Sequence, residues 1–415
     1  MRQTVLNLEE SMIRQVANAG MGRSDVLKFW FGESDEATPQ FIRDAAAASL
    51  QQGETFYAQN LGLPELREAI SGYAQGLRTP GATKIGADRI AVTSGGVNAL
   101  MLAVQALVDS SDEVVVVTPV WPNLTAQPAI MGAMVKCVSL KPVAGAWQLD
   151  MAELLAAVTI KTKVLILNAP NNPTGWTLSR EEQQTLLAHC RETGTWILAD
   201  EVYERLYYDA PPEALRASTQ GAPGLGRPGA GQSRPACAPS FLDISEPDDR
   251  LVVVNSFSKS FLMTGWRLGW LVMPPAMTAQ MGKLIEFNTS SAPVFIQRAG
   301  LVAIERTLDV TPRVVAHLKT CRDTLIPLLQ ALPGVQVAPA RGGMYAFFRL
   351  EDQARFGDSL AIAKSLVLDA GLGLAPGNAF MVNPDSDAQG WLRWCFASQD
   401  LSRLEQGVQR LKSWL

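Results

Sequence analysis

The stretch that decides the fold is Ser256-Phe257-Ser258-Lys259-Ser260-Phe261, followed shortly by Gly265-Trp266-Arg267-Leu268-Gly269. It begins two residues after the apolar run Leu251-Val252-Val253-Val254. A lysine at the end of a buried strand is costly unless something uses its ammonium group. One use is a bond to a carbonyl cofactor, because a desolvated lysine loses its proton more readily and becomes a nucleophile. The hydroxyls and Arg267 beside it suit the phosphate of such a cofactor.

Length and composition bound the class of protein. The chain has 415 residues, enough for two or three packed units, and its 47% hydrophobic and 18% charged residues are typical of a globular protein. A net charge of −4 without a long basic run argues against nucleic acid or an anionic membrane as the main partner. No apolar stretch approaches the roughly 20 residues that span a bilayer. The N-terminus lacks the apolar core of a signal peptide, so we expect a cytoplasmic protein.

Cysteine and histidine usage predicts that the protein has no metal site. The five cysteines are scattered and form no C-x-x-C pair, so idle thiols are favoured over disulfides or metal ligands. The two histidines, His189 and His317, lie in segments that we predict to be helices. This leaves no set of histidines for zinc and makes a Ser-His-Asp triad improbable.

Short apolar runs alternate with helical segments along the first three quarters of the chain. Such runs are typical of a parallel sheet that is covered on both faces, and the alternation predicts an α/β fold. Ser179 and Glu182 form a capping box before one of the helices. The predicted strands cover residues 90–93, 114–117, 164–167, 196–199 and 251–254.

The pattern changes after Pro293, which predicts a second, smaller domain. A long helical stretch over 294–329, broken near Pro312, precedes a small α+β section. An insertion over about 210–240 is rich in Pro, Gly, Ala and Ser and predicts a flexible surface loop. The expected divisions are an N-terminal arm and part of the small domain over 1–37, a large cofactor-binding domain over 38–293, and a small C-terminal domain over 294–415.

Two strands end in residues that suit a phosphate and an aromatic ring. Small residues at Ser94-Gly95-Gly96-Val97-Asn98 open a helix, where backbone N–H groups and the helix dipole favour an anion. A plain tight turn explains the same residues equally well. Trp121 follows the strand at 114–117 and could stack on a ring, although a lone tryptophan is more often a core residue.

The next two strands end in amides and a carboxyl group. Asn171 and Asn172 lie in Asn168-Ala169-Pro170-Asn171-Asn172-Pro173-Thr174-Gly175, which is turn chemistry but also offers donors to a ring oxygen. Asp200 comes at the buried end of the strand at 196–199. An unpaired carboxylate there is costly, so we expect it to meet a cation.

Taken together, these motifs resemble the fold-type I, PLP-dependent aminotransferases of class I/II. The shared set is Asn-Pro-Thr-Gly at 172–175, Asp200-x-x-Tyr203, Ser-x-Ser-Lys at 256–259 and Gly-x-Arg-x-Gly at 265–269. The resemblance covers nearly the whole chain and implies a mostly parallel central sheet flanked by helices, an α/β/α sandwich, with a smaller α+β domain. Further segments that match the family are 31–35, Tyr57 with 62–70, 376–380 and 393–396.

The resemblance implies the cofactor, pyridoxal 5′-phosphate, and the residues that bind its ring. Lys259 forms the aldimine and shuttles the proton between the substrate and the cofactor. Asp200 pairs with the pyridine nitrogen, whose charge makes the ring an electron sink. Tyr203 and Asn172 bind the ring oxygen, and Trp121 stacks on the ring face.

The resemblance also implies a phosphate site that is shared between two subunits. Tyr57 reaches the phosphate of the neighbouring subunit, which implies a homodimer with shared active sites. Within one subunit the implied phosphate ligands are Ser256, Arg267 and the backbone around Gly95, Gly96 and Val97.

The substrate side of the site follows from the same resemblance. Arg393 grips the α-carboxylate through two parallel N–H···O bonds, and the backbone N–H of Gly32 assists it. Trp30 and Phe31 precede Gly32, where the resemblance places the substrate pocket, and two aromatic residues there favour neutral or aromatic side chains. Ser34, Pro122 and Met381-Val382 depart from the family pattern, which weakens any transfer of substrate preference.

The leading hypothesis is therefore transfer of an amino group from an L-amino acid to a 2-oxo acid such as 2-oxoglutarate, by a ping-pong route. A PLP-dependent carbon–sulfur β-lyase has the same cofactor set and stays open as an alternative. A PLP-sensing regulatory module is a third possibility, but such proteins carry a DNA-binding domain in front, and here the N-terminal arm is short and not basic.

Overall fold

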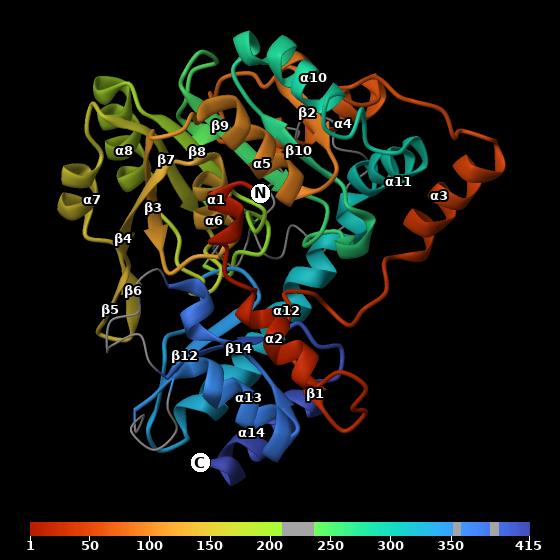
Figure 1. The fold of residues 1–415 in the computed structure, drawn as a ribbon. Coiled ribbons are helices and arrows are strands. Elements are labelled where there is room, and N and C mark those ends of the chain that lie inside the picture. The colour runs from red at the N-terminus through yellow and green to blue at the C-terminus, as the bar shows by residue number, and fades with distance from the viewer. Residues whose placement is uncertain (210–235, 352–357, 382–389) are drawn as a thin grey trace.

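A seven-stranded sheet forms the centre of the large domain of this computed structural model, and a four-stranded sheet forms the centre of a smaller one (Figure 1). The structure describes residues 1–209, 236–351, 358–381 and 390–415. Most of the predicted insertion over 210–240 lies outside these ranges. Among the described residues, none of the helices combines the length and apolar character that crossing a bilayer requires.

The large sheet is mostly parallel, as predicted. Its strands pair in parallel except β10, which runs antiparallel to both of its neighbours. The five predicted strands are confirmed, whereas β4 and β10 were not predicted. In spatial order the strands are β2 (Ile90–Thr93), β10 (Gly269–Val272), β9 (Leu251–Ser256), β8 (Trp196–Asp200), β7 (Thr162–Asn168), β3 (Glu113–Thr118) and β4 (Met134–Ser139).

Helices connect these strands and flank the sheet (Figure 1). The capping box before α8 is confirmed: the Ser179 hydroxyl accepts from the Glu182 N–H at 3.1 Å, and the Glu182 carboxylate accepts from the Ser179 N–H at 2.6 Å. The helices of this part are α3 (Gln40–Gln51), α4 (Pro64–Gly76), α5 (Gly96–Leu107), α6 (Asn123–Met131), α7 (Met151–Ala157), α8 (Arg180–Thr193), α10 (Thr278–Glu286) and α11 (Val294–Glu305).

The smaller domain joins the C-terminal quarter of the chain to its N-terminal arm. In Figure 1 the red α2 and β1 lie among the blue helices of this domain, and β1 pairs in parallel with β13. The antiparallel sheet has the order β11 (Val335–Val337), β12 (Tyr345–Leu350), β15 (Trp391–Cys395) and β14 (Ala375–Pro376). The other elements are α2 (Met12–Ala19), β1 (Leu27–Lys28), α12 (Thr307–Gln330), α13 (Ser359–Ala370), β13 (Leu372–Gly373) and α14 (Leu401–Trp414).

The predicted helical stretch over 294–329 is two helices whose break lies at Arg306, not near Pro312. Arg306 has φ −108° and ψ 28°, which ends α11 before α12 begins. Pro312 lies in the second turn of α12, where it removes one backbone donor without ending the helix. α11 follows the predicted domain boundary at residue 293 but packs against α3 and α4, which precede that boundary. The division of the chain into domains at this residue stays a prediction.

Several short elements complete the chain. A helix, α1 (Gln3–Leu6), contacts α6, and a two-stranded hairpin consists of β5 (Lys141–Val143) and β6 (Ala146–Gln148). Single turns of 3₁₀ helix cover Ala87–Arg89, Phe241–Asp243, Thr264–Trp266, Pro275–Met277 and Gly377–Phe380.

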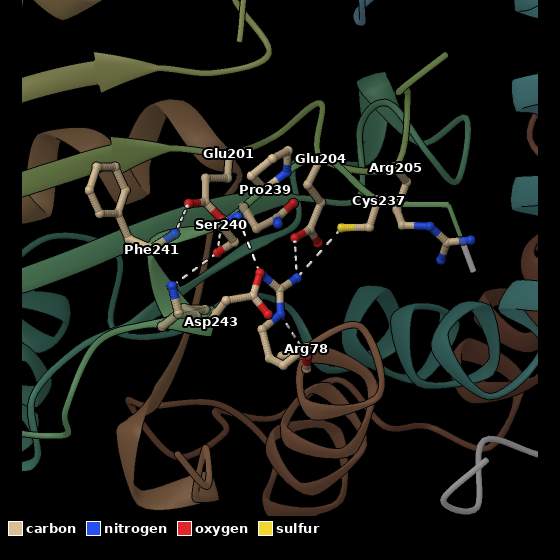
Figure 2. A network of polar contacts seen from close by, with 12 residues as sticks. Arg78, Glu201, Glu204, Arg205, Cys237, Pro239, Ser240, Phe241 and Asp243 are labelled. Carbon is tan, nitrogen blue, oxygen red and sulfur yellow. Dashed lines mark hydrogen bonds and ion pairs between the residues drawn. The ribbon is translucent and has the colours of Figure 1, made fainter. Parts of the chain in front are cut away.

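A buried ionic network holds the turn after β8 in place (Figure 2). The Arg78 guanidinium contacts Glu204 at 2.9 Å and Asp243 at 3.9 Å, and all three side chains are at least nine-tenths buried. Glu201 accepts hydrogen bonds from the Ser240 hydroxyl at 2.6 Å and the Phe241 N–H at 3.2 Å. The residues that follow Asp200 are thus tied to the segment just after α4 through Arg78 and to the 240–243 turn through Glu201.

Replacing Arg78 with alanine should destabilise the protein by about 3–5 kcal/mol, because it leaves the buried Glu204 carboxylate without its cation, whereas Asp243 keeps its contact with Arg180 at 2.9 Å. The free energy of unfolding from chemical denaturation measures this loss. Lys141→Ala is the control, since its ion pair with Glu153 is about half exposed and contributes no more than about 1 kcal/mol. Equal effects of the two substitutions would contradict the structural role of the network.

Candidate active site

A cavity of about 420 Å³ lies where the carboxyl ends of the large sheet face the smaller domain. It gathers residues that are up to 380 positions apart, from Ile13 on α2 to Arg393 on β15. Eleven of the thirteen predicted site residues line it: Gly32, Gly96, Val97, Trp121, Asn172, Asp200, Tyr203, Ser256, Lys259, Arg267 and Arg393.

The structure places the two other predicted residues outside the cavity wall. Gly95 lies directly behind it and caps α5 with φ 95°, a left-handed conformation that favours glycine. Tyr57 is 92% exposed and Phe56 beside it is 83% exposed. Tyr57 is therefore not part of the site that its own chain forms.

The Lys259 amine faces the cavity just after β9. Its Nζ donates a hydrogen bond to the carbonyl oxygen of Gly32 and lies 5.7 Å from the centre of the Tyr203 ring. Burial disfavours the ammonium form and lowers the pKa of Lys259 to about 8. A substantial fraction of the side chain is therefore neutral near pH 8, and a neutral amine is a nucleophile.

Asp200 ends β8 and turns its buried carboxyl group toward the same cavity. Burial raises the pKa of Asp200 to about 7, although the N–H of Val202 donates to it at 3.3 Å. Among the described residues, no lysine or arginine forms an ion pair with it. The structure therefore does not place the expected cation beside Asp200 among the described residues.

One end of the cavity has the donors that a phosphate group needs. The hydroxyls of Ser256 and Ser258 lie 2.9 Å apart at the end of β9, next to the N-terminus of α5. Arg267 adopts a left-handed backbone conformation (φ 56°, ψ 55°), which is uncommon for a residue with a side chain and is often kept at functional sites. A Cβ atom on Gly95 would lie 2.5 Å from Arg267 Nη2, so glycine lets the guanidinium approach the helix.

The wall of the cavity also carries a fixed arginine. Arg393 is 2% exposed and donates to the side-chain oxygen of Asn172 at 3.0 Å and to the Trp30 carbonyl at 2.5 Å. Its guanidinium lies between two rings, 4.5 Å from the centre of Tyr345 and 4.7 Å from that of Phe380. A guanidinium oriented in this way is suited to a carboxylate that enters the cavity.

The sequence reasoning missed several lining residues. Asn168 donates to the Asp200 carbonyl at 3.1 Å and accepts from the Asn172 N–H at 2.7 Å, so it links two predicted residues. It begins the Asn168–Gly175 segment, from which only the two following asparagines were predicted to bind a ligand. Tyr345 lines the cavity from β12, and no local motif marks it. Within the described ranges, no cluster of three or more metal-ligating side chains occurs.

Comparison with known proteins defines the class to which this fold and site belong. Residues 24–411 match the family described as Aminotransferase class I and II. A probable aspartate/prephenate aminotransferase of Aquifex aeolicus is 31% identical over 394 residues, which cover 94% of this chain and 91% of that protein. An aspartate aminotransferase of Thermotoga maritima is 30% identical over 391 residues, which cover 94% of this chain and 92% of that protein.

Solved structures show the same architecture. An aspartate aminotransferase of Thermus thermophilus, a single mutant, superposes with a TM-score of 0.84 at 27% sequence identity and covers 100% of this chain and 99% of its own. The fold and the matched length define a fold-type I PLP enzyme. The chain belongs to the class I and II aminotransferases, and this family uses PLP.

The residues present fit that cofactor. The carboxyl group of Asp200 lacks a cation and could meet a protonated ring nitrogen. Hydroxyls, a helix N-terminus and Arg267 lie together on the cavity wall and suit a phosphate group, and the Lys259 amine faces the same cavity. The ionisable side chains of Asp200, Lys259 and Arg267 all face this cavity.

The lowered pKa of Lys259 predicts how the cofactor-free protein should react with PLP. The rate at which it becomes yellow should rise with pH through a midpoint near 8, because only the neutral amine attacks an aldehyde. Stopped-flow absorbance over pH 6–10 measures this rate. An exposed lysine would give a midpoint near 10.4, and finding that value here would contradict the effect of burial.

Proposed function

We propose that this protein is a PLP-dependent aminotransferase that moves the amino group of a neutral or aromatic L-amino acid to a 2-oxo acid such as 2-oxoglutarate, by a ping-pong route. The observation that carries the proposal is that Lys259, Asp200 and Arg393 face one cavity. PLP, when bound, supplies an aldehyde for an amine and a ring that accepts electrons.

The residues around the ring would have two roles, which are proton transfer and stabilisation of the charge on the ring. The Lys259 amine would move a proton from the substrate Cα to the aldehyde carbon of the cofactor in the first half of the cycle, and in the reverse direction in the second half. Asp200 keeps the ring nitrogen protonated through its negative charge. Tyr203 and Asn172 donate to the ring oxygen, and Trp121, which is partly buried in the cavity wall, covers one ring face.

The two ends of the cavity would orient the molecules that react. Ser256, Arg267 and the backbone at Gly95–Val97 hold the phosphate. Arg393 binds the α-carboxylate of the substrate. Its contacts with Asn172 and with the rings of Tyr345 and Phe380 already hold the guanidinium in place. The Gly32 N–H would assist from the N-terminal arm, and its carbonyl accepts from Lys259.

The substrate preference is supported by apolar residues on the cavity wall. Ile13, Phe31 and Leu100 line it and suit a neutral or aromatic side chain. Trp30, in contrast, packs in the core against the backbone of Gly373, so only one of the two predicted aromatic residues faces the cavity.

A basic residue at the cavity supports 2-oxoglutarate as the acceptor. The Arg14 guanidinium lies 5.0 Å from the centre of the Phe31 ring, and both residues line the cavity. Arg14 forms no ion pair among the described residues, so its charge is available to the distal carboxylate of 2-oxoglutarate.

A panel of amino donors with 2-oxoglutarate or pyruvate tests this function. Phenylalanine, leucine and methionine should give a higher kcat/KM than aspartate. Arg14→Gln should raise the KM for 2-oxoglutarate about 3- to 10-fold and leave that for pyruvate within about twofold, because only the first has a second carboxylate. Aspartate far ahead of the other donors would overturn the preference. Pyruvate and ammonia formed from a cysteine conjugate without an acceptor would instead indicate a carbon–sulfur lyase.

Exposed aromatic residues support the homodimer. Phe56, Tyr57 and Phe287 are each at least 83% exposed, which is costly for aromatic rings unless another surface covers them. In a dimer of the proposed kind, Tyr57 would reach the phosphate end of the partner's cavity.

A mixed dimer tests whether two subunits share each site. Lys259→Ala should abolish turnover and leave PLP bound without a covalent bond, since the phosphate and ring contacts remain. Tyr57→Phe should weaken PLP binding about tenfold through loss of a hydrogen bond to a charged group. Co-expressed subunits, one with each substitution, should regain one native site per dimer, measured as kcat/KM at limiting PLP. Activity no higher than that of the Tyr57→Phe protein would contradict shared sites.

The thiols support a location in the cytoplasm. All five cysteines are within the described residues and all are free. Burial raises the pKa of Cys137 to about 11 and that of Cys190 to about 12, so these thiols are unreactive near neutral pH. Scattered, unpaired and unreactive thiols are typical of proteins in a reducing compartment.

A further inference from the structure

Tyr345 contacts both halves of the site, although no sequence motif marks it. It begins β12 in the smaller domain and is 1% exposed. Its hydroxyl lies 2.7 Å from the hydroxyl of Tyr203 in the large domain, and the two rings meet edge to face with centres 5.8 Å apart. A hydrogen bond between two buried hydroxyls therefore connects the domains directly at the cavity wall.

The backbone opposite Tyr345 leaves room for this hydroxyl. A Cβ atom on Gly32 would lie 2.0 Å from the Tyr345 oxygen, which is closer than any real contact. A side chain at position 32 would thus displace the hydroxyl from Tyr203. Glycine at this position serves the contact between the two tyrosines as well as the substrate.

The ring of Tyr345 has a second neighbour, Arg393. The guanidinium carbon lies 4.5 Å from the ring centre, within the range of a cation–π interaction. The two residues come from paired strands, with Tyr345 opposite Cys395 and Arg393 opposite Phe347. One side chain therefore contacts the residue proposed to bind the ring oxygen and the residue proposed to bind the carboxylate.

We propose that Tyr345 is a positioning residue with two separate actions: its hydroxyl donates to Tyr203 and strengthens that residue's hydrogen bond to the cofactor, and its ring seats Arg393 for the substrate carboxylate. This inference rests on the proposed function and adds a residue to it.

Proton counting sets the direction of the hydrogen bond between the two hydroxyls. Burial raises the pKa of both tyrosines above the ordinary value, so each keeps its single proton near neutral pH. The ionised ring oxygen of PLP only accepts, so the Tyr203 proton goes to it. Tyr345 must then donate to the Tyr203 oxygen, and a chain of two such bonds makes each of them stronger.

The effect of the Tyr345 hydroxyl should be measurable in a pH titration of the PLP-loaded protein. Negative charge on the ring oxygen favours the proton on the nearby Lys259 nitrogen, and a strong donor to that oxygen reduces this effect. Tyr345→Phe weakens the donor, so the pKa of the Lys259 nitrogen in the loaded protein should rise by about half a unit. Tyr203→Phe removes the hydroxyl that donates to the ring oxygen and should raise the pKa of the Lys259 nitrogen by more.

Two variants separate the two actions of Tyr345. Tyr345→Phe keeps the ring and should leave the Kd for 3-phenylpropionate, an unreactive carboxylate, within about twofold of the native value. Tyr345→Leu removes the ring under Arg393 and should raise this Kd roughly 2- to 30-fold. Tyr208→Phe is the matched control, because its buried hydroxyl donates to the Gly343 carbonyl and does not line the cavity.

The experiment is a spectroscopic pH titration of the PLP-loaded native protein and of each variant. The Kd for 3-phenylpropionate is measured on the same proteins from the change in absorbance when the ligand is added. An upward shift in Tyr345→Phe but not in Tyr208→Phe supports the inference. Equal shifts in both variants, or no shift in Tyr345→Phe, would overturn the action of the hydroxyl. An unchanged Kd in Tyr345→Leu would overturn that of the ring. A native protein that stays colourless with PLP refutes the proposed function instead.

Discussion

The carboxyl group of Asp200 is the constraint on which the rest of the site depends. It is buried at the end of β8, and no cation of the described chain neutralises it. Arg78 and its partners hold the turn that follows Asp200 (Figure 2). Asn168 donates to the Asp200 carbonyl. Burying a carboxyl group is costly unless it stays neutral or meets a cation. The position of Asp200 on the cavity wall suits a cationic ligand.

The position of the smaller domain is as important as the sheet. Asn172 and Tyr203 belong to the large domain, whereas Arg393 and Tyr345 belong to the small one, and hydrogen bonds of 3.0 Å and 2.7 Å join them in pairs. The N-terminal arm adds the carbonyl oxygens of Trp30 and Gly32 as acceptors for Arg393 and Lys259. Any shift between the domains would thus change the cofactor side and the carboxylate side together.

What the sequence could predict follows from how local each signal is. Asp200 ends an apolar strand, and Lys259 and Asn172 follow the ends of two others. Because parallel strands of one sheet end at one edge, the convergence of these residues could be predicted without coordinates. Strand β10 was missed because its four residues continue directly from the Arg267 motif. Tyr345 could not be predicted, since its partners are 142 and 48 residues away: packing of the two domains brings it to Tyr203, and pairing of β12 with β15 brings it to Arg393.

The alternation of a β-strand explains how one short segment serves both stability and chemistry. Asp200 and Glu201 are neighbours in sequence, yet Asp200 faces the cavity while Glu201 binds Ser240 and Phe241 on the opposite side. Successive side chains of an extended chain point to opposite faces, so one carboxyl group is exposed to a ligand and the next anchors the turn. Burial raises the pKa of Glu201 to about 8, but two donors from the protein satisfy it. The two carboxyl groups differ in their partners: the protein supplies two donors to Glu201, whereas Asp200 accepts from the Val202 N–H and faces the cavity without a cation of the described chain.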